Sequence, residues 1–282
     1  MTRIAVLTDS SADLTSELLA EHGITMVPLT VHFGDQSFED RIDISPAEFM
    51  ERLQREPALP RTSQPAPDRF EETFRSLGET HDAVLAVLHS SKLSDTVKSA
   101  TIAREAVAPD VRVSVIDSRN ASLGLGLQAI RAAELVRSGL DLDEIARRLR
   151  AETTSYHTAF FVDTLEYLQR EGRIGRAVSM MGTLIHLKPI LRIDEGQVVP
   201  YERARTRSRA LAALSGFVRG FPTIAKLAVL YTSNREDAEQ FASEFAELVP
   251  PDQIYIAQFG PVIATHLGPG ALGVGVFEGE SE

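Results

Sequence analysis

The sequence contains no cysteine among its 282 residues. Disulfide bonds and metal sites built on thiolates are therefore excluded, and the composition is compatible with a reducing cytoplasm. Long apolar runs are also missing, because no stretch approaches the roughly 20 residues that a membrane-spanning helix needs. The opening residues, MTRIAVLTDSSADL, become acidic too soon for a secretory signal peptide. We expect a soluble cytoplasmic protein without stable membrane insertion.

Positive charge is scarce, since 29 Lys and Arg face 40 Asp and Glu and give a net charge of −11. An acidic surface repels phosphate backbones, so binding to nucleic acid is disfavoured. Motifs for nucleotides and metals are missing too. The GLG of residues 124–126 completes no G-x-G-x-x-G, and the chain contains neither a P-loop nor H-E-x-x-H. We expect no cofactor and no metal.

Apolar runs that lead into polar loops dominate the first half of the chain. Strands are expected at residues 4–9, 24–33, 82–89 and 111–117. The helix after the first strand would span residues 10–23, with a capping box of Ser10 and Asp13 and a stop at Gly23. An insert between the second and third strands carries two further helices. This alternation predicts an α/β domain with a mostly parallel sheet.

The pattern changes near residue 155. A strand, a helix that stops at a glycine and a hairpin about Glu195 and Gly196 come first. A helix, a strand, an amphipathic helix and a strand at QIYIAQFG complete the second half. We place a boundary near residues 152–156, which divides the chain into an N-terminal domain, 1–154, and a C-terminal domain, 155–282.

Loops after the strands of an open α/β sheet are where ligands bind. In SSKLSDT, Ser94 stands where a helix should begin, so its hydroxyl and the N–H groups of Asp95 and Thr96 suit an anion. Alternatively, Ser94 only caps its own helix. Asp9 and Asp117 also end strands and could hold a metal, although loop hydrogen bonding is the favoured interpretation.

Two further segments invite both a structural and a functional interpretation. The loop RTSQPAP is stiffened by prolines and carries hydroxyls at Thr62 and Ser63, either to start a helix or to form one wall of a site. His266 lies in IATHLGPGALG, where a flexible glycine-rich turn would let the backbone approach a ligand. It is either an anion donor that titrates near neutral pH or an ordinary loop histidine.

Arg173 and Arg176 follow a helix end in LQREGRIGR. They either pair with the helix dipole or recognise a carboxylate, a phosphate or an acidic partner. The next stretch, residues 177–191, is strongly apolar and has two adjacent methionines. It is predicted to form a buried helix, although methionine-rich linings also suit a pliable apolar ligand.

Eight motifs occur in order along the chain: TDSSADL, TSQPAP, SSKLSDT, DSRNASLGLG, TLEYLQREGRIGR, LKPIL, ERARTRSRAL and THLGPGALG. In this the sequence resembles the DegV family, the bacterial fatty-acid-binding proteins that include the binding component of fatty acid kinase. The resemblance implies a two-domain α/β protein that holds one fatty acid in an apolar tunnel between its domains. A separate ATP-using kinase subunit would then phosphorylate the carboxylate.

The resemblance also implies roles for individual residues. Thr62, Ser94 and His266 match the residues that hold the carboxylate, and their neighbours Ser63, Asp95 and Thr96 complete the expected ligand-binding set. Arg173, Arg205 and Arg207 match arginines expected to dock the kinase subunit. Asp95 departs from the family, which commonly has glycine there, and we expect its carboxylate to point to solvent.

The expected function is thus to bind a long-chain fatty acid, of the palmitate or oleate class, and to present its carboxylate to the kinase subunit. On this interpretation the protein is a non-catalytic component, and no nucleophile–base pair is visible in the sequence. Two alternatives stay open: a stand-alone hydrolase or transferase that uses Ser94 with His266, and a lipid sensor that acts through a protein partner. An unaided enzyme would turn over an acyl ester or ATP, whereas a carrier would not.

Overall fold

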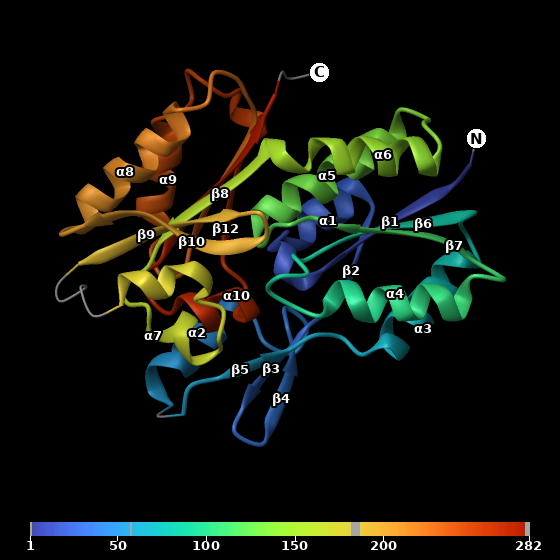
Figure 1. The fold of residues 1–282 in the computed structure, drawn as a ribbon, viewed down its shortest axis with the longest axis horizontal. Coiled ribbons are helices and arrows are strands. Elements are labelled where there is room, and N and C mark those ends of the chain that lie inside the picture. Colours follow the sequence, from blue (N-terminus) through green and yellow to red (C-terminus); the bar gives the residue numbers. More distant parts are fainter. Residues whose placement is uncertain (1, 57, 182–186, 280–282) are drawn as a thin grey trace.

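The computed structural model describes residues 2–56, 58–181 and 187–279, which form three β-sheets (Figure 1). The first is wholly parallel, with strand order β2-β1-β6-β7. Its strands are β1 (Ile4–Asp9), β2 (Ile24–Val27), β6 (Ala83–Leu88) and β7 (Arg112–Asp117). All residues of β1 and β6 are buried, as their continuous apolar sequence predicts for strands covered on both faces.

Helices cover both faces of the parallel sheet. On one side lie α3 (Pro67–Gly78) and α4 (Thr96–Val107), and the phenylalanines of α3 are fully buried against the sheet. On the other lie α1 (Ser16–His22), α5 (Leu123–Arg137) and α6 (Leu142–Glu152). The predicted helix-flanked parallel sheet is therefore confirmed.

The second half of the chain forms a mixed six-stranded sheet of order β10-β9-β8-β13-β11-β12, in which the β11–β12 pair alone is parallel. Its strands are β8 (Tyr156–Phe161), β9 (Lys188–Asp194), β10 (Gln197–Ala204), β11 (Ile224–Tyr231), β12 (Ile254–Gln258) and β13 (Leu272–Glu278). Helices α8 (Arg207–Arg219) and α9 (Arg235–Ser243) cover its outer face, while α5 lies against its inner face (Figure 1). This confirms the predicted fold class; the exact domain boundary at residues 154/155 stays a prediction.

The insert forms a small antiparallel sheet of order β4-β3-β5 below the other two (Figure 1). Its elements are β3 (Thr30–Phe33), β4 (Gln36–Glu39), α2 (Pro46–Arg55) and β5 (Arg61–Ser63). The strand region expected over residues 24–33 is therefore two strands in different sheets, interrupted at Pro28, which has no N–H to donate. The start of RTSQPAP is a strand and not a loop, because it pairs with β3.

Several predicted helices differ from the structure. The helix expected over residues 10–23 begins only at Ser16, with Thr15 as its N-cap, although it does end at Gly23. A 3-10 turn, η1 (Ser10–Ala12), precedes it, and Asp13 adopts φ 56°, so the capping box of Ser10 and Asp13 does not form. Helix α7 (Glu166–Arg170) is shorter than expected. Short 3-10 turns also occur at η2 (Thr153–Ser155) and η4 (Pro251–Gln253).

The apolar stretch 177–191 is not one buried helix. Its first part belongs to the 3-10 helix η3 (Gly175–Met180), and its last part belongs to β9. Residues 182–186 lie outside the described residues. Helix α10 (Pro261–Leu267) and strand β13 were not predicted at all. None of the helices in the described ranges is long and apolar enough to cross a membrane.

Candidate functional site

A cavity with about 810 Å³ of space unoccupied by protein atoms lies where the three sheets meet. The loops after β6 and β7 bound it on one side, and the inner face of the six-stranded sheet bounds it on the other. Strand β5 and helix α10 also contribute to its wall.

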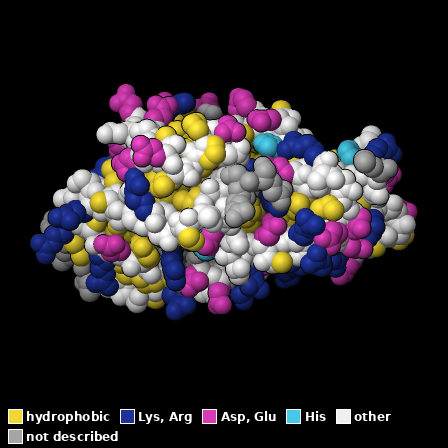
Figure 2. Space-filling view, turned by 90° about the horizontal axis from the view of Figure 1, so that it is seen from above, with side chains coloured by type: hydrophobic (Ala, Val, Ile, Leu, Met, Phe, Trp, Pro, Cys, Tyr) yellow, Lys and Arg dark blue, Asp and Glu magenta, His cyan; other side chains and the backbone are white. Residues whose placement is uncertain are grey.

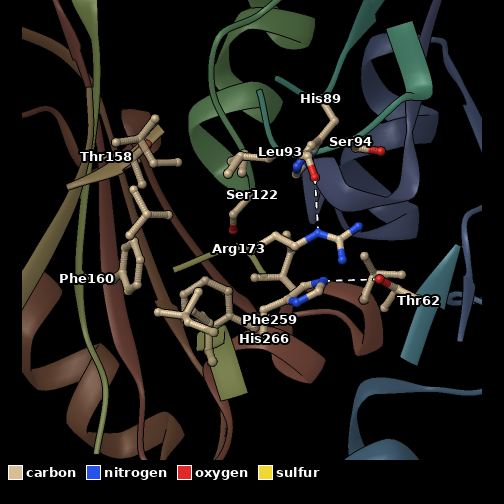
Figure 3. Close-up of a pocket in the computed structure, with 18 of the residues that line it drawn as sticks. Thr62, His89, Leu93, Ser94, Ser122, Thr158, Phe160, Arg173, Phe259 and His266 are labelled. Carbon is tan, nitrogen blue, oxygen red and sulfur yellow. Dashed lines mark hydrogen bonds between the residues drawn. The ribbon is translucent and has the colours of Figure 1, made fainter. Parts of the chain in front are cut away.

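The lining of the cavity is apolar with a polar cluster on one side. Apolar walls come from β8, β9, β10, β11, α10 and the segment between β12 and α10, and include Phe160, Ile193, Val198, Leu230 and Phe259. The polar side chains are Thr62, Ser63, His89, Ser94, Ser122, Arg173 and His266, together with Gln64 and Thr158. In Figure 3, Thr62, Ser94, His89 and Arg173 lie on one side of the view, opposite Phe160 and Thr158. This polarity suits a molecule with one anionic end and an apolar body.

Thr62 and His266 meet across 204 positions of sequence, with their Oγ1 and Nε2 atoms 3.2 Å apart (Figure 3). Strand β5 brings Thr62 there, because it pairs with Val31 of β3 at the edge of the small sheet. The next residue, Ser63, also lines the cavity, and its Oγ lies 2.9 Å from His32 Nε2. Two of the predicted ligand-binding hydroxyls are thus placed together with the predicted histidine.

Ser94 lines the cavity and directly precedes Asp95, the N-cap of α4, so its role as an anion donor stays a prediction. Its Oγ accepts the N–H of Thr96 at 3.3 Å and lies 2.8 Å from Thr96 Oγ1, at the first residue of α4. Asp95 is exposed, as expected, and Thr96 is fully buried. Neither Asp95 nor Thr96 lines the cavity, so the structure does not bring them together with the other predicted ligand-binding residues.

His266 lies in the last turn of α10, and not in a flexible turn as predicted. The glycines that suggested flexibility follow the helix: Gly268, with φ +69°, ends it against the ring of Tyr167. Burial is the main cause that lowers the pKa of His266 to about 3, and the nearby Arg173 and His89 act in the same direction. Its Nδ1 is buried without a hydrogen-bond partner among the described residues. His266 is therefore neutral at physiological pH, which corrects the expectation that it titrates near neutrality.

Arg173 brings a positive charge to the cavity wall. Its Nε donates to the carbonyl of Leu93 at 3.3 Å and its Nη1 to the carbonyl of Glu171 at 2.5 Å. In Figure 3 its guanidinium lies between Leu93 and His266. Both acceptors are neutral carbonyls, although Glu171 also forms a long ion pair at 3.8 Å. The residue predicted to face a partner protein thus lines the same cavity as Thr62 and Ser94.

Arg205 and Arg207 lie away from the cavity and differ from each other. Arg207 is held within the protein, since its Nε and Nη1 donate at 2.7 Å to Asp237 and to the carbonyl of Gly270. Arg205 is exposed and lines a surface groove between β10 and α8. Arg203 and Arg209 line the same groove, and none of these three has an ion-pair partner among the described residues.

Sequence reasoning missed the buried carboxylate that joins the cavity to α10. Asp13 is fully buried and accepts hydrogen bonds from Ser122 Oγ at 2.5 Å and from the N–H of Gly260 at 2.8 Å. Its partner Arg41 donates from Nη2 at 3.0 Å. Gly260 immediately precedes α10, so Asp13 fixes both the Ser122 hydroxyl and the start of the helix that carries His266.

The glycines and strand-end acids that raised cofactor hypotheses have structural roles. A Cβ on Gly124 would lie 2.2 Å from Thr158 Oγ1, so this glycine allows α5 to approach β8 closely. Asp117 accepts the N–H groups of Ser91 and Arg119. No group of three metal-binding side chains occurs among the residues that the structure describes.

Surface charge was expected to disfavour nucleic acid. On the face in Figure 2, acidic and basic side chains are interspersed. The candidate site is the cavity. Its cluster of polar side chains comes from segments far apart in the chain: β5, the loops after β6 and β7, the turn after α7, and α10.

Comparison with known proteins places the chain in one family. Residues 3–279 match the profile described as "Uncharacterised protein, DegV family". The chain is 35% identical to Protein DegV of Bacillus subtilis over 277 residues, which cover 96% of this chain and 98% of that protein.

Solved structures agree in fold. A DegV family protein from Thermus thermophilus, described as binding fatty acid, superposes with a TM-score of 0.90 at 35% identity, covering 98% of this chain and 99% of that one. A stearic-acid-binding protein from Eubacterium ventriosum superposes with a TM-score of 0.89 at 26% identity, covering 99% and 98%. By sequence, fold and nearly complete coverage, the chain belongs to the DegV family.

Proposed function

We propose that this protein binds one long-chain fatty acid, with the acyl chain along the apolar walls of the cavity and the carboxylate at its polar side. The observation that carries the proposal is the convergence of Thr62, Ser94 and His266 with Arg173 on one wall of a largely apolar cavity. The similar proteins from Thermus thermophilus and Eubacterium ventriosum are described as binding fatty acids, which supports the same ligand class here.

The energetics favour an apolar ligand with a modest anchor. Burying methylene groups contributes about 0.8 kcal/mol each, or on the order of 10 kcal/mol for a sixteen-carbon chain. The carboxylate then needs only a few donors, and the hydroxyls of Thr62 and Ser94 supply two of them. Ser63 adds a third hydroxyl. Asp95 and Thr96 contribute indirectly, because they follow Ser94 at the start of α4 and help to hold its hydroxyl in place. Arg173 provides the charge that offsets desolvation of the carboxylate.

A second part of the proposal concerns a partner. The bound carboxylate is presented to a separate ATP-dependent kinase subunit in the cytoplasm, which converts it to an acyl phosphate. The groove lined by Arg203, Arg205 and Arg209 supports docking of an acidic surface, because these guanidinium groups have no ion-pair partner among the described residues. Arg207 does not line this groove, because its guanidinium is bonded to Asp237 and to the carbonyl of Gly270.

Geometry argues against a stand-alone hydrolase or transferase. A serine nucleophile needs a base within hydrogen-bond reach. Ser94 Oγ is paired with Thr96, whereas His266 Nε2 is paired with Thr62. The proposed base therefore contacts the wrong hydroxyl for a Ser94–His266 mechanism.

Extraction of the purified protein into organic solvent, followed by mass spectrometry, tests the binding proposal. We expect a fatty acid of the palmitate or oleate class at a stoichiometry near one. Delipidated protein should take up palmitate but bind methyl palmitate much more weakly, because the ester cannot carry the charge that Arg173 neutralises. Protein that carries no fatty acid and takes up neither palmitate nor oleate would refute the proposal.

A further inference from the structure

His89 is a buried histidine of the cavity wall that is bonded to the loop after β1. It directly follows β6 and is 7% exposed. The ring Nδ1 of His89 lies 2.6 Å from Ser11 Oγ, and the backbone N–H of His89 donates to Asp9 Oδ2 at 2.8 Å. Asp9 Oδ1 also accepts the N–H of Ser11 at 3.0 Å and the Ser11 hydroxyl. The three residues therefore form one closed hydrogen-bond network.

The network fixes which nitrogen of His89 carries the proton. A carboxylate only accepts hydrogen bonds, so the single hydroxyl proton of Ser11 is directed to Asp9. The oxygen of Ser11 must then accept from the imidazole, which places the ring proton of neutral His89 on Nδ1. Nε2 is left as a bare acceptor. It has no partner among the described residues and is not among their fully enclosed polar atoms, so it faces the cavity that the ring lines.

Charged and titratable groups surround His89 from four elements. Asp9 ends β1, Asp117 ends β7, Arg173 follows α7 and His266 belongs to α10. Burial lowers the pKa of His89, the two carboxylates oppose this, and Arg173 acts in the same direction as burial. The ring is therefore neutral in the empty cavity, and a bare nitrogen lone pair lies beside the groups proposed to hold a carboxylate.

A lone pair on Nε2 and a lone pair on a carboxylate oxygen repel each other unless a proton lies between them. We infer that His89 is a head-group residue that binds the fatty acid together with one proton, shared between a carboxyl oxygen and Nε2, with Asp9 and Ser11 as its positioning residues. The inference rests on the proposed function. Because free carboxylate and free imidazole are both unprotonated above about pH 6.5, binding there takes up a proton.

Calorimetric titration with monomeric dodecanoate from pH 6.5 to 8.5, in two buffers of different ionisation heat, tests this on the wild-type protein. We expect uptake of close to one proton per ligand at the lower end of the range, with an affinity that falls as pH rises by up to about tenfold per unit. Dodecanol should bind with an affinity that does not depend on pH, because it has no carboxyl group.

Variants locate the proton. His89→Asn keeps a donor toward Ser11 but removes the nitrogen that faces the cavity, so proton uptake and the pH slope should both disappear. Ser11→Ala releases the ring from its fixed tautomer and should reduce both. His81→Asn, at a histidine outside the cavity lining, should retain them.

The outcomes separate the two claims. Wild-type protein that binds dodecanoate without proton uptake, or a His89→Asn variant with the wild-type slope, overturns the role of His89 and leaves fatty-acid binding intact. Wild-type protein that binds no fatty acid at any pH refutes the proposed function itself. If His89→Asn does not fold, the wild-type titration still tests the inference, because binding of dodecanoate without proton uptake overturns it.

Discussion

The hydroxyl of Ser90 donates a hydrogen bond of 2.8 Å to the carbonyl of Gly196. Gly196 lies in the two-residue turn of the β9–β10 hairpin, and both strands of that hairpin contribute to the cavity wall through Ile193 and Val198. Ser90 belongs to the loop that also carries Ser94. The hairpin that forms part of the apolar wall is therefore fastened to the loop that carries Ser94.

Replacing Gly196 should separate the β9–β10 hairpin from the loop that carries Ser90. In Gly196→Ala, the new Cβ would lie 2.4 Å from Ser90 Oγ at a backbone φ of +80°. Gly172→Ala is the matched control, because its φ is +71° and nothing lies within 4 Å of its Cβ. The control should lose about 1–2 kcal/mol of unfolding free energy from backbone strain alone, and Gly196→Ala should lose more and also release fatty acid faster. Urea unfolding and ligand-release rates measure the difference; equal losses in both variants would contradict the close contact.

Head-group donors should affect affinity without changing chain selectivity. Thr62→Val and Ser94→Ala each remove one hydroxyl, which should cost about 1–3 kcal/mol of binding free energy, or about ten- to hundredfold in affinity. The ratio of palmitate to dodecanoate affinity should stay at its wild-type value, because the acyl walls are untouched. Thr80→Val, at an exposed threonine, is the control. A changed chain-length ratio in Ser94→Ala would place Ser94 beside the acyl chain.

Arg173 and Arg205 should separate ligand binding from partner docking. Arg173→Gln removes the charge on the cavity wall and should lower fatty-acid affinity by about tenfold or more. Arg205→Gln should leave that affinity unchanged but slow acyl-phosphate formation by a kinase subunit. Equilibrium binding and the coupled phosphorylation rate are measured on both variants. Full affinity in Arg173→Gln, combined with poor phosphorylation, would return Arg173 to the docking role that the sequence predicts.

Asp40 should make stability depend on pH. It is fully buried, and the charged side chains of Arg41 and Asp13 lie near it. Burial raises its pKa to about 7, against the opposing charge of Arg41. Between an unfolded pKa near 3.9 and this value, the folded state binds more protons, so the free energy of unfolding falls as pH rises. The full loss of unfolding free energy, on the order of 4 kcal/mol, is reached above about pH 7.

Asp40→Asn removes this titration. Compared with wild-type protein, the variant should be more stable at pH 8, and its advantage should shrink steadily toward pH 4. Urea unfolding at pH 5, 6, 7 and 8 gives the comparison, with exposed Asp35→Asn as the control. A stability difference that is constant across this range would show that Asp40 does not titrate there.

Periodicity predicted the parallel sheet well because its strands are continuous apolar runs. It fails at β13, where Gly273 and Gly275 interrupt the apolar pattern. The structure explains these glycines, since a Cβ on Gly273 would lie 2.9 Å from Phe259 and one on Gly275 would lie 3.3 Å from the backbone N of Gly124. Glycine serves both close packing at the centre of a sheet and flexibility in a loop. A single sequence does not show which of the two applies.

Only part of the site can be predicted from the sequence, because local patterns do not show which distant segments meet. Thr62, Ser94 and His266 could be named from motifs, and the structure places all three in the cavity wall. His89 carries a sequence signal, because it directly follows a buried parallel strand, but the serines of the same loop share that signal. Asp13 carried none, since its partners Ser122 and Gly260 lie 109 and 247 positions away in sequence. Contacts of that range depend on the whole topology.

Helix α5 has a consequence for how the molecule can be divided. Nearly all of its residues are buried, and it contacts β1 and β6 of the parallel sheet as well as β8, β11 and β13 of the mixed one. A fragment cut at the predicted boundary would keep α5 but uncover the side that faces the second sheet. That apolar surface would favour aggregation over independent folding, so the two halves are expected to gain their stability, and the cavity between them, in a single cooperative step.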